Sequence, residues 1–241
     1  MTYVRNVLPR LAGVDGVRTT LLVGGILRGE ISESAQVKVL NESLPEGSGR
    51  RFWYEQRRLP IMIRNSGADV LLSTGNFALY RSPVPQILLS RNALYTSADF
   101  IRDVRQRGDY RLWMDTEIKG ALARSSVKVA DCTVAPSATF ASQLRDWTGK
   151  EVKSIHHGFD HQAFFRERAP LGQDVQRRLA AAEGAVRVLF VSHYNYYRNF
   201  ETLIRAIAIV KKMLRPRDVR LILTCKLSSK DNPGIYQADR A

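Results

Sequence analysis

A histidine, an arginine and an asparagine follow an apolar run late in the chain. The run reads RVLFVS over residues 187–192, His193 comes next, and Arg198 and Asn199 stand just before a second apolar segment. An arginine between a strand and a helix suits phosphate binding, because its guanidinium is forked and the helix N-terminus is positive. The same arginine could equally be a solvated surface residue. Asn199 is suited to capping the helix that follows.

Three histidines lie close together in the middle of the chain, at His156, His157 and His161. No cysteine or carboxylate cluster completes a metal site around them, so we expect no bound metal. The segment instead reads as a turn. We expect Gly158 to adopt a backbone angle that other residues avoid, and Asp160 to bond nearby backbone amides.

The elements that position these residues have the pattern of an α/β fold. Continuous apolar runs of about five residues, bounded by turn residues, are typical of strands in a parallel sheet. The sequence predicts strands at 19–23, 37–40, 69–73, 86–90, 131–135, 152–155, 187–192 and 219–224. It predicts helices at 3–11, 57–64, 98–107, 110–126, 200–214 and from a cap at Ser137 to about Trp147, with a loop at 42–51.

The net charge of +14 over 241 residues is the unusual feature of the composition. Phosphorylated substrates, an anionic membrane, nucleic acid or simple solubility would each account for it. No nucleic-acid-binding motif is present, which argues against nucleic acid. Residues 100–113 interleave arginines with apolar residues and form either a basic membrane-surface helix or the core face of an ordinary helix. The two cysteines, Cys132 and Cys225, and the lack of a secretory signal indicate the cytoplasm, with peripheral contact at the inner face of the membrane as an open alternative.

Four ordered segments resemble the family 4 glycosyltransferases. Residues 188–206, VLFVSHYNYYRNFETLIRA, resemble the first strand and helix of that family's C-terminal domain. Residues 129–137 resemble its last N-domain strand, which ends in a Pro-Ser pair. Residues 155–160, with Phe164, resemble its interdomain segment, and residues 3–11 its first N-domain helix. The resemblance implies the GT-B fold, in which two Rossmann-like domains face each other.

The resemblance also implies a retaining transfer of a hexose from a nucleotide-diphosphate sugar to a glycan, lipid or small-molecule acceptor, with no further cofactor. The positions that match the donor diphosphate site are Ser192, His193, Arg198 and Asn199, where the family more often has Gly, Arg, Lys and Gly or Asn. The family's N-domain histidine falls at Arg91, followed by Asn92. These two and Ser137 are candidates for the cleft or the acceptor, and the catalytic residue stays unknown.

The predicted organisation is a nearly complete N-terminal Rossmann-like domain over residues 1–165, a connector over 166–186, and the first βαβ of a C-terminal donor-binding domain over 187–241. His157, Gly158 and Asp160 fall at the hinge. A single βαβ buries little surface, and the first helix lacks a preceding strand. We therefore expect a fragment, incomplete at both ends and with little activity. The alternative is a non-catalytic module that binds an acceptor or a partner.

Overall fold

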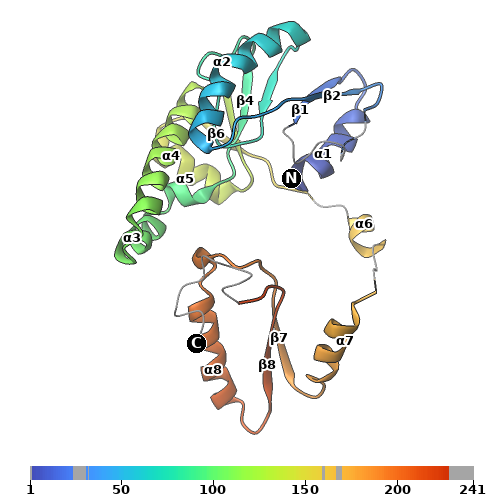
Figure 1. Cartoon of the computed structure of the whole chain (residues 1–241), viewed down its shortest axis with the longest axis vertical. Helices are drawn as coiled ribbons and strands as arrows, with labels where there is room; N and C mark the ends of the chain where they lie inside the picture. Colours follow the sequence, from blue (N-terminus) through green and yellow to red (C-terminus); the bar gives the residue numbers. More distant parts are fainter. Residues whose placement is uncertain (1, 24–30, 32, 159–160, 167–169, 228–241) are drawn as a thin grey trace. The chain divides into compact units, whose positions relative to one another are not determined.

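The computed structural model describes residues 2–23, 31, 33–158, 161–166 and 170–227. The chain divides into two compact units, Met1–Phe165 and Arg166–Ala241 (Figure 1). Every pairing between the named strands is parallel, as the continuous apolar runs predict. The prediction of an α/β fold of Rossmann-like type is therefore confirmed.

The first unit contains two parallel sheets. Strands β1 (Thr19–Val23) and β2 (Val37–Asn41) form a pair. Strands β3 (Leu71–Ser73), β4 (Gln86–Leu89), β5 (Cys132–Ala135) and β6 (Val152–Ser154) form a four-stranded sheet in that order. All six lie within or beside their predicted ranges. Because these strands all run parallel, the residues after β4, β5 and β6 leave the sheet at one edge.

Helices connect these strands. They are α1 (Thr2–Ala12), α2 (Ser48–Ser66), the 3-10 helix η2 (Ala93–Thr96), α3 (Ala98–Gln106), α4 (Tyr110–Val129), α5 (Ala138–Thr148) and α6 (His161–Arg166). The prediction of a loop over 42–51 is wrong at its end, since α2 already begins at Ser48. Gly47 turns the chain there with a φ of 87°, and Arg51 pairs with Glu55 one turn on, at 2.7 Å. Local pairing thus extends the helix into a segment whose composition is typical of a loop.

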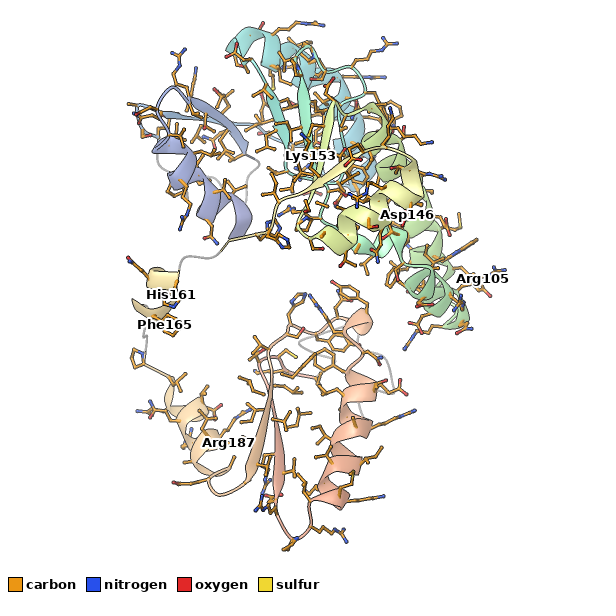
Figure 2. The ribbon with its side chains drawn as sticks, turned by 180° about the vertical axis from the view of Figure 1, so that it is seen from behind. Arg105, Asp146, Lys153, His161, Phe165 and Arg187 are labelled. Carbon is orange, nitrogen blue, oxygen red and sulfur yellow. The ribbon has the colours of Figure 1, made fainter. Side chains whose placement is uncertain are left out.

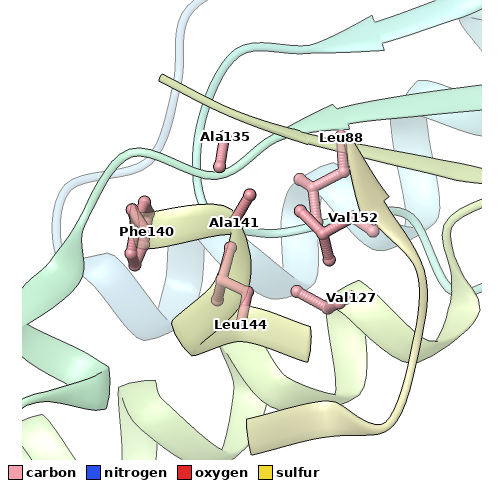
Figure 3. Packing of buried hydrophobic residues seen from close by; sticks show 8 residues of the cluster. Leu88, Val127, Ala135, Phe140, Ala141, Leu144 and Val152 are labelled. Atoms are coloured by element: carbon pink, nitrogen blue, oxygen red, sulfur yellow. The ribbon is translucent and has the colours of Figure 1, made fainter. Parts of the chain in front are cut away.

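The core of the first unit lies where α4 and α5 meet the four-stranded sheet (Figure 3). Leu88 of β4 and Val152 of β6 are fully buried, and Leu144 of α5 and Val127 of α4 close over them. Phe140, Ala141, Ala135 and Ala78 complete the cluster. Burial of each large side chain stabilises the unit by roughly 1.5–3 kcal/mol. This packing fixes the edge at which β4, β5 and β6 end.

The basic amphipathic stretch at 100–113 serves as a core face. Val104 is 1% exposed, and the guanidinium of Arg105 lies 5.6 Å from the ring centre of Trp113. Helices α3 and α4, which carry these side chains, pack against each other. Val104 of α3 therefore contributes to the packing of the first unit, as the core-face alternative predicts.

The second unit is a strand-helix-strand preceded by helix α7 (Gln173–Ala180). Strands β7 (Val186–Phe190) and β8 (Val219–Leu223) pair in parallel, with Val188 opposite Leu221 and Phe190 opposite Leu223. The 3-10 helix η3 (Tyr196–Arg198) and helix α8 (Phe200–Met213) connect them. Both strands end one or two residues before their predicted ends. The terminal residues of each predicted run instead line the hollow described next.

Candidate functional site

A hollow opens where β7 and β8 end. It has a volume of about 420 Å³ and is lined by Val191, Ser192, His193, Arg198, Thr224 and Cys225. Because the two strands are parallel and in register, their carboxyl ends lie side by side. The hollow therefore combines the residues after β7, the residues after β8 and the entry to α8.

Thr224 links the ends of β7 and β8 through two hydrogen bonds. Its Oγ1 accepts a hydrogen bond from the Ser192 amide and donates one to the Ser192 carbonyl, both at 2.9 Å. The hydroxyl of Ser192 donates to the carbonyl of His193, also at 2.9 Å. Ser192 thus lines the hollow, but its amide and hydroxyl donors are both used within the chain. Ser192 therefore contributes to the lining of the hollow but offers no unused donor to a ligand.

Arg198 supplies a positive charge to the hollow from the entry of α8. Its amide donates to the carbonyl of Asn195 at 2.8 Å, which closes the short turn of η3. Its guanidinium lies 5.5 Å from the ring centre of Tyr197, and the residue is exposed. A cation held over an aromatic ring keeps its charge while part of its stem is shielded. Arg198 is therefore placed to meet an anion that enters the hollow from solvent.

Asn199 caps α8 as predicted, in an uncommon backbone conformation. Its φ and ψ are 54° and 48°, the left-handed region that asparagine tolerates better than most residues. Its side chain accepts from the Thr202 amide at 3.3 Å, and its carbonyl accepts from Leu203. These bonds leave the amides of Phe200 and Glu201 as the first-turn donors that Asn199 does not engage.

Phe200 anchors this helix entry to the strands. It is 1% exposed and lies between Phe190 of β7, at 5.3 Å between ring centres, and Tyr194, at 5.4 Å. Aromatic contacts of this kind contribute roughly 0.5–1.5 kcal/mol beyond burial. The positive end of α8 is thus held next to Arg198, which lines the hollow, whereas Asn199 is not among the lining residues.

Thr224 and Cys225 belong to the hollow but were not predicted from the sequence. The signal was available: when two strands are parallel neighbours, the residues after the second strand lie beside those after the first. Burial raises the pKa of the Cys225 thiol above its ordinary value. The thiol is therefore present as the neutral group at neutral pH, and it adds no negative charge to the hollow.

The candidates of the first unit lie at one edge of the four-stranded sheet. Asn76 accepts from the amides of Arg91 and Asn92 with a single side-chain oxygen, at 2.8 and 3.0 Å. Asn92 in turn accepts from the amide of Leu94 and caps η2. Ser137 caps α5 by accepting from Phe140, as predicted. Asn92 and Ser137 thus both cap the helices that follow β4 and β5.

The hinge residues are described only in part. Asp160 lies outside the described residues. The expectation for Gly158 is wrong, because its φ is not in the left-handed region and a Cβ there would meet open space. His157 and Gly158 follow β6 in an irregular segment. Within α6 the rings of His161 and Phe165 lie 4.6 Å apart, centre to centre, and are tilted by 55° (Figure 2). Across the described ranges, no three His, Cys, Asp or Glu side chains gather as a metal site would require.

No family model matches the chain, and no curated protein matches it in sequence. A solved structure does resemble it: the N-terminal domain of trehalose-6-phosphate phosphatase from Candida albicans, with a TM-score of 0.51 at 10% sequence identity. The match covers 92% of this chain and 60% of that chain, so this chain spans less than two-thirds of its length. At such low identity the likeness shows a common α/β fold and nothing of the activity. None of the described helices combines the length and apolar character needed to cross a bilayer.

Proposed function

We propose that the hollow in the second unit binds the diphosphate of a nucleotide sugar. The observation that carries this proposal is that Arg198, just before the N-terminus of α8, lines one hollow together with the residues at the carboxyl ends of β7 and β8. In open α/β sheets, ligands bind outside the carboxyl ends of the strands. Helix N-termini at that edge favour phosphate, because their amides and their dipole both attract negative charge.

On this proposal the chain is part of a retaining glycosyltransferase of the GT-B class, which transfers a hexose to a glycan, lipid or small-molecule acceptor. The bond that breaks joins the sugar's anomeric carbon to a phosphate oxygen, and its electron pair leaves with the diphosphate. An acceptor hydroxyl oxygen forms the new bond to that carbon, and its proton passes to the departing diphosphate. Cations and fixed donors beside the developing charge lower the barrier. Arg198 and the first-turn amides of Phe200 and Glu201 are the groups of this chain proposed to supply them, and the donor is a substrate, so no further cofactor is proposed.

The neighbouring side chains are compatible with an anion. Glu201 stands in the first turn of α8, but its carboxylate pairs with Arg205 one turn further along. His193 lines the hollow and is exposed. We propose that His193 donates a hydrogen bond to the diphosphate through a ring N–H. In the first unit, Arg91, Asn92 and Ser137 are proposed to line the acceptor side.

The decisive experiment measures binding of UDP, GDP and ADP by calorimetry, with Arg198→Gln compared with Lys212→Gln. Both variants remove one positive charge from α8 or its entry, but Lys212 stands in the last turn, at the opposite end from the hollow. Hydrogen bonds to charged groups contribute roughly 1.5–3 kcal/mol. Because Arg198 is exposed, we expect the lower value, which weakens binding about tenfold. Lys212→Gln should bind as the wild type does.

Two results would contradict the proposal. One is that no nucleoside diphosphate binds the wild-type chain. The other is that Arg198→Gln and Lys212→Gln bind equally well. Binding of a glycan or lipid acceptor without any nucleotide would instead favour a non-catalytic acceptor-binding module. Arg198→Lys refines the result, since it keeps the charge but loses the fork and should fall between the wild type and Arg198→Gln.

A further inference from the structure

The far end of α8 carries a cluster of positive charge that the proposed donor site does not use. Lys211 and Lys212 stand in the last turn of the helix, and Arg215 and Arg217 follow in the turn that leads to β8. These four, with Ala208, Pro216 and Asp218, line a hollow of about 400 Å³. We call these four cations and the hollow the basic corner.

The positive charge of the basic corner is only partly balanced. Asp218 accepts a hydrogen bond from Arg220 at 2.6 Å and lies 3.6 Å from Lys211. Within the part of the chain that the structure describes, no ion pair involves Lys212, Arg215 or Arg217. The hollow is thus lined by four cations and a single carboxylate that is shared with a fifth.

Large apolar side chains are exposed beside these cations. Met213 is 76% exposed, Ile209, one turn earlier on α8, is 59% exposed, and Leu214 is 37% exposed. All of residues 211–217 are exposed, so the four cations lie on one accessible segment with Met213 and Leu214 between them. Large apolar side chains that lie together on a surface, bordered by polar residues, are typical of sites that contact a protein or a membrane.

We propose that the basic corner binds the surface of an anionic lipid bilayer. The cations would meet headgroup phosphates, while Met213 and Leu214 would enter the boundary between headgroups and acyl chains. Favourable interaction with the helix dipole accounts for Lys211 and Lys212 but for neither Arg217 nor the exposed Met213. A single-stranded nucleic acid would favour aromatic side chains for base stacking, and residues 208–220 contain none. This inference is independent of the proposed donor site.

The test uses the full chain and vesicle co-sedimentation. Vesicles of phosphatidylcholine with about one-third phosphatidylglycerol are compared with vesicles of phosphatidylcholine alone. Each cation near such a surface strengthens binding about fivefold. We therefore expect the double variant Lys212→Gln/Arg215→Gln to bind anionic vesicles about thirtyfold more weakly. The control Lys128→Gln/Lys150→Gln removes the same charge from exposed positions of the first unit and should bind as the wild type does.

Insertion of the apolar side chains is tested separately with Met213→Trp. Because residue 213 is so exposed, the substitution should not disturb folding, and brominated lipids should quench the added fluorescence. At matched ionic strength, inorganic phosphate should displace the chain from anionic vesicles no more than chloride does, if the bilayer itself is the ligand. The proposal is overturned by equal binding to neutral vesicles, by equal losses in the two double variants, by stronger displacement with phosphate than with chloride, or by binding to RNA but not to vesicles.

Discussion

The substitution Thr224→Val removes one hydroxyl group and should destabilise the pairing of β7 and β8 at their carboxyl ends, where the proposed donor site lies. Valine keeps the size and β-branching of threonine but can neither accept from the Ser192 amide nor donate to its carbonyl. Those two bonds continue the β7–β8 pairing beyond its last register pair, Phe190 with Leu223. The variant therefore separates the strand ends without creating a cavity.

The cost follows from the two bonds. A neutral hydrogen bond contributes roughly 0.5–1.5 kcal/mol net to stability. Because Thr224 is exposed, water can bond to the Ser192 amide and carbonyl when the hydroxyl is removed. We expect a loss of about 1.4 kcal/mol, which corresponds to about tenfold faster amide exchange in peptides that contain the ends of β7 and β8. Exchange measured by mass spectrometry suits this question, because all three tryptophans lie in the first unit and fluorescence would not report on the second.

Thr224→Ser is the matched control, since serine keeps the hydroxyl. It should exchange at nearly the wild-type rate and retain nucleotide binding, whereas Thr224→Val should weaken nucleotide binding together with the faster exchange. Equal exchange rates in the valine and serine variants would refute the reasoning. Faster exchange with unchanged nucleotide binding would separate the strand ends from the donor site.

Two further predictions concern the same unit. Asn199→Ala should destabilise the first turn of α8 by about 2 kcal/mol, about half from the lost cap and about half from the left-handed backbone of the alanine. Asn199→Gly should lose less than half of that stability, and amide exchange in residues 200–206 measures both variants. The hydrogen bond from Arg220, assisted by the charge of Lys211, lowers the pKa of Asp218, so this carboxylate stabilises the fold above its unfolded pKa and loses that effect as the pH falls through the folded pKa. Arg220→Gln should raise the pKa of Asp218 towards its ordinary value in an NMR titration of the carboxyl carbon, and an unchanged titration would show that another group holds it.

The strands were the most predictable part of this fold. Runs such as residues 86–90 and 187–192 are apolar and bounded by turn residues, and both contain a strand of the parallel sheets. The hydrophobic periodicity does not indicate which strand pairs with which. The sequence predicted one N-terminal domain, and the first unit has two separate sheets within it. Pairing depends on contacts between distant residues, which no local window records.

The site was predictable where local chemistry decides it. Asn199 and Ser137 are caps, and a cap is read from one residue and the apolar run after it. The partner of Ser192 was not predictable in this way, because Thr224 lies 32 positions away. The same holds for Asn76, whose oxygen holds the amides of Arg91 and Asn92 from across a loop.

The core of the first unit has a consequence for the order of folding. Ala135, Phe140, Ala141, Leu144 and Val152, most of the buried cluster, come from the continuous segment β5–α5–β6. The β4–β5 pair, in contrast, must close across η2, α3 and α4, and long-range pairing of parallel strands slows folding. We expect β5–α5–β6 to acquire native burial first, as a nucleus on which β4 and then β3 add. Substitutions in α5 should therefore slow folding, while those in β3 should mainly speed unfolding.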